Sequence, residues 1–194
     1  DEDTVYVLSA RAFRSIDGGK TGKRRYSGHG DYHDLWINPD NSKNMIISDD
    51  GGGEITFDNG ITWSSIYNMP TAQFYRLNVD NLFPYNLYGG QQDNSTVKIA
   101  SIGSRGGISE RDWSASAGGE SAFLAFDPDN PSIVMGGSYL GSVNIYDTKA
   151  NARKKVMIEP INYIGRASRD MKYRFNWNAP IIWSQHCLLY TSDA

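Results

Sequence analysis

The sequence predicts an all-β chain of short antiparallel strands, and three observations support this. Its 194 residues include 20 Gly, 12 Tyr and 5 Trp, a composition typical of short strands joined by tight turns. Apolar residues show almost no helical periodicity, so we expect no helix beyond a single turn near residues 167–172. Two motifs also recur along the chain, which indicates a repeated structural unit.

The first repeated motif has the form S/T-x-D-x-G-x-T. It occurs at residues 15–21 and again at 56–62, where Trp63 follows the second copy. Asp17 and Asp58 are 41 positions apart, which is about the length of one four-stranded propeller blade. An aspartate that accepts backbone N–H groups and a glycine with positive φ are typical of a tight turn. We therefore expect a structural turn before the last strand of each blade.

The second repeated motif is an Asn/Asp-Pro-Asp-Asn turn between two apolar runs. It occurs at residues 38–41 and 127–130, and a looser copy lies at 80–85. Proline presets φ for a turn, and the Asn and Asp side chains close it. We expect this turn to join the first and second strands of a blade.

These turns predict a fragment of a β-propeller, with four-stranded antiparallel blades whose strands run from a (innermost) to d (outermost). Three complete blades are expected at 28–68, 69–116 and 117–160, and partial blades at 1–27 and 176–186. The expected strands are 5–8, 12–15 and 23–26; 33–37, 45–48, 54–57 and 63–67; 73–79, 87–90, 97–101 and one ending near 113; 122–126, 133–137, 142–146 and 155–158; and 180–184. Because a closed propeller takes about four to eight blades, we expect the remaining blades to be missing from this chain.

Net charge, apolar runs and cysteine count indicate which partners and which kinds of site are not expected. The net charge of −3 gives no reason to expect a nucleic acid, and no apolar run approaches the roughly 20 residues of a membrane span. Cys187 is the only cysteine, which excludes an internal disulfide framework and a Cys-x-x-Cys metal site.

Several blocks of the sequence resemble bacterial BNR-repeat (Asp-box) proteins of the glycosyl hydrolase-like or sortilin-N-terminal-like kind, in the superfamily of xyloglucanase-type propellers. Besides the two aspartate turns, the blocks are 29–39, 73–75, 89–94 and 175–180. The resemblance implies a secreted, periplasmic or cell-surface protein that binds a glycan or a peptide. Gly22 departs from the pattern, since it stands where a Trp is expected. Residues 187–194 do not continue the pattern, and we expect them to be a non-native tail.

Blade topology predicts where a ligand binds. The d-to-a and b-to-c loops share one face, around the channel, and both repeated turns lie on the other face. Polar residues outside the repeats gather in the loops of the channel face, so we expect the site there. The candidate ligand-binding residues are His29, His33, Gln91, Gln92, Asn176 and Asn178, and the candidate carboxylates are Asp31, Asp50, Asp93 and Glu120.

Three interpretations of these residues remain open. The first is a binding propeller without catalysis, for carbohydrate or peptide. The second is a glycoside hydrolase, in which two of the carboxylates act as a pair about 5–5.5 Å or 6.5–9.5 Å apart. The third is a site for Ca²⁺ or another divalent metal, formed by His29, Asp31 and His33 if these residues are extended; otherwise no cofactor is expected. The aromatic residues Trp36, Tyr75 and Trp177 are expected to pack between blades, with stacking on sugar rings as the alternative.

Overall fold

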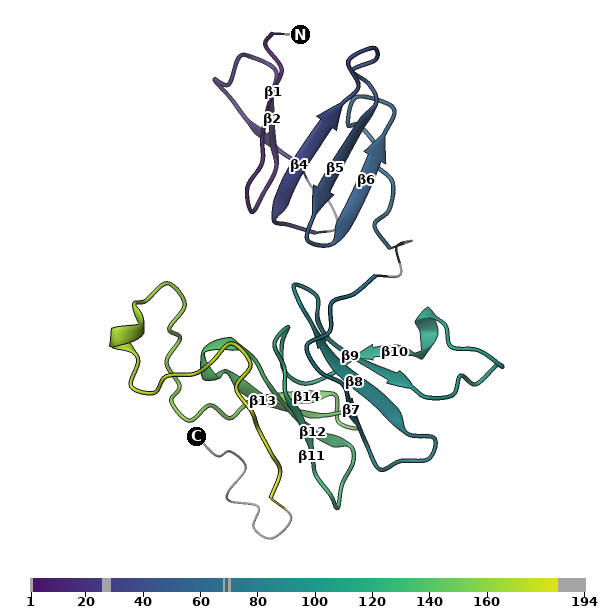
Figure 1. Cartoon of the computed structure of the whole chain (residues 1–194), viewed down its shortest axis with the longest axis vertical. Coiled ribbons are helices and arrows are strands. Elements are labelled where there is room, and N and C mark those ends of the chain that lie inside the picture. Colours follow the sequence, from purple (N-terminus) through teal and green to yellow (C-terminus); the bar gives the residue numbers. More distant parts are fainter. Residues whose placement is uncertain (1, 26–28, 68, 70, 185–194) are drawn as a thin grey trace. The chain divides into compact units, whose positions relative to one another are not determined.

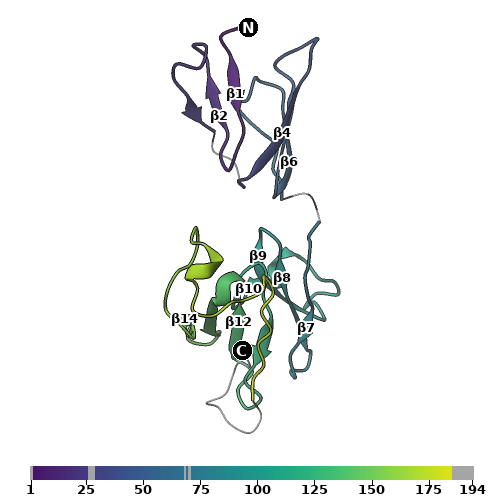
Figure 2. The ribbon, with the colours of Figure 1, turned by 60° about the vertical axis from the view of Figure 1, so that its left-hand side comes forward.

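A computed structural model describes residues 2–25, 29–67, 69 and 71–184 (Figures 1 and 2). The chain divides into two compact units, residues 1–71 and 72–194, which are described separately below. The expected tail at 187–194 lies outside the described residues.

The first unit contains two three-stranded antiparallel sheets. One consists of β1 (Val5–Val7), β2 (Phe13–Ser15) and β3 (Lys23–Arg24), and the other of β4 (Tyr32–Ile37), β5 (Met45–Asp49) and β6 (Gly52–Thr56). In both sheets, strands that are consecutive in the chain are neighbours. Ala12, Tyr32 and Ile47 form the buried core between them, with Leu35 and Trp63 packed against it.

The two aspartate turns have the same hydrogen-bond pattern, as their repeated sequence predicts. In the first turn, the Gly19 N–H donates to Ser15 Oγ (2.9 Å) and the Thr21 N–H donates to Asp17 Oδ1 (2.8 Å). In the second turn, the Gly60 N–H donates to Thr56 Oγ1 (3.0 Å) and the Thr62 N–H donates to Asp58 Oδ1 (2.9 Å). Gly19 and Gly60 have φ values of 86° and 77°, which favour glycine at both positions.

The carboxylates of both turns have lowered pKa values. The side-chain hydrogen bonds from Ser15 and Thr21 lower the pKa of Asp17 to about 2, and those involving Thr62 and Thr56 lower the pKa of Asp58 to about 2. Since the unfolded chain titrates near the ordinary value of 3.8, ionised Asp17 and Asp58 favour the folded state above that pH. This contribution is lost as the pH falls from about 4 toward 2.

We therefore expect Asp58→Asn to flatten the loss of stability between pH 4 and pH 2, because the variant has no carboxylate to protonate in this turn. The measurement is the free energy of unfolding from urea titrations at several pH values in that range. Asp40→Asn, at an exposed aspartate, is the matched control and should keep the slope of the parent chain. An unchanged slope in Asp58→Asn would contradict the assignment.

The fourth strand expected at 63–67 is absent, so this prediction was wrong. The backbone hydrogen bonding between the segment after Thr62 and β6 is at Ile55. The Ser64 N–H donates to the Ile55 carbonyl oxygen (2.9 Å), and the Ile55 N–H donates to Ser64 Oγ (3.0 Å). Because the Ser64 side chain takes the Ile55 N–H in place of a backbone carbonyl, a regular ladder does not form.

The second unit contains two four-stranded antiparallel sheets. One consists of β7 (Asn78–Val79), β8 (Asn86–Gln91), β9 (Ser95–Ala100) and β10 (Trp113–Ala115). The other consists of β11 (Leu124–Phe126), β12 (Ile133–Gly137), β13 (Val143–Asp147) and β14 (Ala152–Lys155). Helical structure in the described chain is limited to three 3-10 turns: η1 (Glu110–Asp112), η2 (Tyr139–Gly141) and η3 (Ser168–Asp170).

The predicted fold class is confirmed. The described residues are all-β, and their four antiparallel sheets have the consecutive strand order of propeller blades. Besides the missing strand at 63–67, three details differ from the prediction. The strand expected at 73–79 is reduced to β7 and a bridge between Phe74 and Gln91, and the strand expected at 155–158 lies earlier, as β14. Residues 180–184 form no strand, although Ile181 is buried against Ala125 and Met135.

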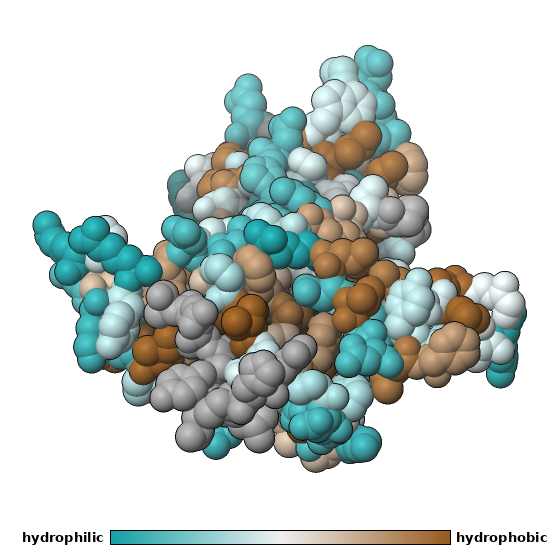
Figure 3. Space-filling view, turned by 60° about the horizontal axis from the view of Figure 1, so that its bottom comes forward, coloured by the Kyte–Doolittle hydropathy of each residue, from teal (hydrophilic) through white to brown (hydrophobic). Residues whose placement is uncertain are grey.

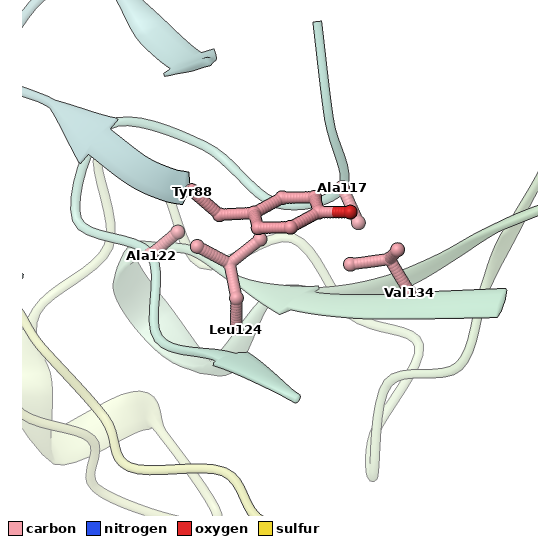
Figure 4. Packing of buried hydrophobic residues seen from close by; sticks show 5 residues of the cluster. All are labelled: Tyr88, Ala117, Ala122, Leu124 and Val134. Atoms are coloured by element: carbon pink, nitrogen blue, oxygen red, sulfur yellow. The ribbon is translucent and has the colours of Figure 1, made fainter. Parts of the chain in front are cut away.

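The core of the second unit centres on Tyr88, which is 1% exposed. Its ring lies among Ala117, Ala122, Leu124 and Val134, so β8 packs against β11 and β12 (Figure 4). The Tyr88 hydroxyl donates to Asp80 Oδ2 (2.9 Å). Burial, followed by the hydrogen bond to Asp80, raises the pKa of Tyr88.

Asp80 is a buried carboxylate with a full set of donors. Burial alone would raise the pKa of Asp80, but hydrogen bonds from Asn86, Tyr88 and the Leu82 N–H outweigh it and lower the pKa. The closest of these contacts joins Asn86 Nδ2 to Asp80 Oδ2 (2.6 Å). The loose third copy of the Asn/Asp turn therefore supplies a buried hydrogen-bond partner, Asp80, for the Tyr88 hydroxyl.

Candidate functional site

Three loops of the second unit converge near the end of β8. They are the β8–β9 turn, the loop between β10 and β11, and the segment that follows η3. Their contact begins at Glu120, whose Oε2 accepts hydrogen bonds from the Asp93 N–H (2.8 Å) and from Gln92 Nε2 (3.2 Å). Gln92 Nε2 also donates to Asp93 Oδ1 (2.7 Å). One amide group therefore bridges two carboxylates and offsets their mutual repulsion.

Glycine at position 90 allows this contact to form. A Cβ atom on Gly90 would lie 2.7 Å from the Glu120 carbonyl oxygen and 2.8 Å from the Ala122 nitrogen. Both atoms are backbone and cannot rotate away, so only glycine lets the β10–β11 loop approach β8 this closely. The turn is completed by Asp93, which has a φ of 60°, a left-handed conformation that aspartate tolerates better than most residues.

Aromatic side chains extend this network. The Tyr75 hydroxyl donates to Gln92 Oε1, and the Trp177 indole N–H donates to the Tyr75 hydroxyl (2.9 Å). The Trp177 ring stacks on Tyr139, with centroids 4.9 Å apart and planes 8° from parallel. Trp177 is still 45% exposed, so it offers an aromatic surface to solvent. We call Tyr75, Gln92, Asp93, Glu120, Tyr139 and Trp177 the aromatic–carboxylate cluster.

The sequence-predicted residues of this unit lie in or beside the cluster. Gln92, Asp93 and Glu120 belong to it, and Asn178 Nδ2 donates to the Ser121 carbonyl oxygen (3.2 Å), next to Glu120. Gln91 lies at the start of the same turn, where its amide donates to the Asn94 carbonyl oxygen (3.5 Å). Asn176 is exposed and precedes Trp177. Of the aromatic residues expected to pack between blades, Trp177 and Trp36 are 45% and 52% exposed in this chain.

The predicted residues of the first unit form a smaller group at the start of β4 and the β5–β6 turn. His33 Nε2 contacts Asp50 Oδ1, and the His33 side chain is 66% exposed. The His29 ring lies against Gly51, since a Cβ there would be 2.6 Å from His29 Cβ. Asp50 lies at one end of β6, and the Asp58 turn follows the other end, as blade topology predicts.

The suggested metal site at His29, Asp31 and His33 does not form. Asp31 has a φ of 57°, so the segment is not extended and the side chains do not alternate as a strand would require. Between residues 2 and 184, apart from the few undescribed positions, no group of three His, Cys, Asp or Glu side chains is arranged to hold a metal ion. No helix within the described ranges is long and apolar enough to cross a membrane.

Comparisons with known proteins add little to this geometry. No protein family model matches the sequence, and no curated protein matches it. A solved structure described as "YCF48 bound to D1 peptide" is similar over 82% of this chain, with 14% identity and a TM-score of 0.30. The match covers 51% of that chain, so the present chain spans about half its length.

Proposed function

We propose that this chain is the ligand-binding part of a secreted or cell-surface β-propeller protein of the BNR type, and that the aromatic–carboxylate cluster binds a carbohydrate. The observation that carries the proposal is the exposed Trp177 ring, held in place by Tyr139 and Tyr75 beside two carboxylates and an amide. Aromatic faces pack against the C–H faces of sugar rings, and carboxylates and amides bind sugar hydroxyls.

The rigidity of the cluster also favours binding. Trp177 is held by its stacking on Tyr139 and by the hydrogen bond to Tyr75, which in turn contacts Gln92. A side chain that is already ordered loses little conformational entropy when a ligand arrives. A flexible aromatic residue on an exposed loop would bind more weakly for the same contact area.

The geometry of the aromatic–carboxylate cluster suits glycoside hydrolysis less well than it suits binding. Asp93 and Glu120 are the candidate carboxylates brought together in this unit, but Gln92 Nε2 lies between them and donates to both. An acid and base pair must reach the glycosidic bond from two sides and exchange protons with it. Carboxylates bridged by an amide donor are better suited to hold hydroxyl groups in place.

The first test is a glycan array and a peptide array, probed with the whole chain, followed by calorimetry with the best oligosaccharide. We expect Trp177→Ala to weaken that binding by about tenfold or more, equivalent to about 1.4 kcal/mol. Glu120→Gln should weaken it as well, because it removes the ionised acceptor that holds Gln92 and the Asp93 N–H.

Trp113→Ala is the matched control, since Trp113 lies on β10 of the same unit and is 56% exposed. It should bind as the parent chain does. Recognition of peptides and no oligosaccharide would overturn the carbohydrate assignment. Release of reducing ends from the bound oligosaccharide, abolished by Glu120→Gln, would contradict a purely binding role.

A further inference from the structure

A hollow of about 190 Å³ lies beside the aromatic–carboxylate cluster, in the same unit. Its walls come from η2 with its flanking residues, from the end of β14, and from residues 161–164. The side chains that matter for recognition are Tyr139, Lys155, Met157, Asn162 and Tyr163. The volume is below the about 300–1,000 Å³ of sites for drug-sized ligands, so the hollow admits one small group, of the size of a single sugar ring.

The walls of the hollow are fixed in place. Tyr163 is 6% exposed, and its hydroxyl donates to Glu159 Oε2 (2.9 Å). The backbone of the same segment is closed by the Arg166 N–H, which donates to the Tyr163 carbonyl oxygen (3.0 Å). Tyr139, which also lines the hollow, is stacked on Trp177. The lining therefore includes two ordered aromatic side chains together with Lys155 and Asn162, whose Oδ1 accepts a hydrogen bond from the Ile164 N–H (3.0 Å).

Basic residues predominate in the segment that supplies most of the lining of this hollow. Residues 149–174 hold eight of the 19 Lys and Arg residues of the chain and only two of its 22 Asp and Glu residues. Of these two acids, Glu159 accepts a hydrogen bond from the Tyr163 hydroxyl, and Asp170 forms an ion pair with Arg169 (Oδ1 to Nε, 4.0 Å). Hydrophilic side chains cover the projecting lobe that carries η3 (Figure 3). The ion pairs between described residues do not involve Lys155.

We propose that this hollow binds a carboxylated sugar residue, such as a hexuronate, with the carboxylate at Lys155 and the ring between Tyr139 and Tyr163. The inference rests on the proposed carbohydrate binding and names its ligand class. A basic lobe raises the local concentration of an anionic ligand, and this attraction weakens as salt is added. The apolar face of Met157 and the tyrosine rings suit the C–H faces of a sugar, and Asn162 suits its hydroxyls.

Tyr139 links the hollow to the aromatic–carboxylate cluster, because it contributes to both. The hollow and the cluster are therefore neighbours on the surface of this unit, and we place different residues of one oligosaccharide at each. The carboxylates Asp93 and Glu120 would repel an acidic sugar, so the acidic residue belongs at Lys155 and a neutral or hydroxyl-rich residue belongs at the cluster.

The test is calorimetry of the whole chain with a trisaccharide of two neutral hexoses that ends in one hexuronate residue, and with the methyl ester of that residue. We expect the acid to bind at least tenfold more tightly than the ester in low salt, with the difference shrinking at high salt. Lys155→Met should remove most of that difference and leave binding of the ester unchanged. Trp177→Ala should weaken the binding of both ligands by the same factor. This result would distinguish the contribution of the hollow from that of the aromatic–carboxylate cluster.

Lys154→Met is the matched control. It makes the same change in net charge on the same strand, but successive side chains of a strand point to opposite sides, and Lys154 does not line the hollow. The acid should bind this variant as it binds the parent chain. Equal binding of acid and ester, or an equal loss in Lys154→Met and Lys155→Met, would overturn the proposal. So would hexaglutamate binding as tightly as the trisaccharide that ends in a hexuronate.

If no oligosaccharide binds and Trp177→Ala has no effect on any glycan, the proposed function itself fails. If neutral oligosaccharides bind through Trp177 but the acid binds no more tightly than the ester, the proposed function stands. Only the assignment of the hollow to a carboxylated sugar is then rejected. The two failures are therefore distinguishable.

Discussion

Replacing Tyr88 by Ala is expected to lower the free energy of unfolding of the chain by about 3–5 kcal/mol, the range for removing a large aromatic side chain from a core. Tyr88 is 1% exposed and touches both sheets of its unit, so its removal leaves a cavity between β8 and β12. The loss is compounded at Asp80, which would keep its buried carboxylate without the hydroxyl donor. Urea unfolding followed by circular dichroism measures the change.

Two further variants separate packing from hydrogen bonding. Tyr88→Phe keeps the ring and removes only the donor to Asp80, so we expect a smaller loss of about 1–3 kcal/mol. Tyr85→Ala is the control, since Tyr85 is 47% exposed, and it should cost less than either. If Tyr88→Ala and Tyr85→Ala were equally stable, Tyr88 would not be the centre of this core.

Gly90→Ala is expected to cost about 1–3 kcal/mol, as overpacking commonly does. The added methyl group would lie 2.7 Å from the Glu120 carbonyl oxygen, so the β10–β11 loop must move away from β8. That movement separates Glu120 from Gln92 and from the Asp93 N–H. We therefore expect carbohydrate binding to weaken in the folded fraction of the variant, in addition to the loss of stability.

Gly107→Ala is the matched control, because no atom lies within 4 Å of a Cβ built at that position. It should keep both the stability and the binding of the parent chain. Calorimetry below the unfolding midpoint separates the two effects of Gly90→Ala. A variant that loses stability but binds normally would show that the close approach of the loop is not required for the site.

The turns and the order of the strands could be predicted because they depend on short sequence motifs. In the aspartate turns, the hydrogen bonds of the Asp17 and Asp58 carboxylates run to residues at most four positions away, so the motif itself determines the geometry at these two side chains. The Asn/Asp turns likewise fix which strands are neighbours. Sorting the loops by face then brings Gln92, Asp93 and Glu120 to the same place in the second unit, because strand order determines which loops meet.

The remaining features depend on contacts between distant residues. Arg25 is one example: it is paired with Glu54 (2.9 Å) and lies over the Trp63 ring, and nothing near it in the sequence distinguishes it from Arg24. The stacking of Tyr139 on Trp177 is another, since 38 positions separate the two residues. The predicted metal site at Asp31 failed for a local reason instead, the backbone conformation of one residue. A single residue with positive φ reverses the side-chain alternation that any strand-based prediction assumes.

The missing fourth strand beside β6 has a consequence for solubility. An unpaired strand edge offers a row of backbone groups to which another chain can add, and Ile55 is an exposed apolar residue in the middle of this one. Both backbone groups of Ile55 are occupied by Ser64, through its N–H and its hydroxyl. One serine therefore occupies the two backbone groups of this edge strand that lie beside its exposed apolar side chain, where addition of another chain would be most favourable.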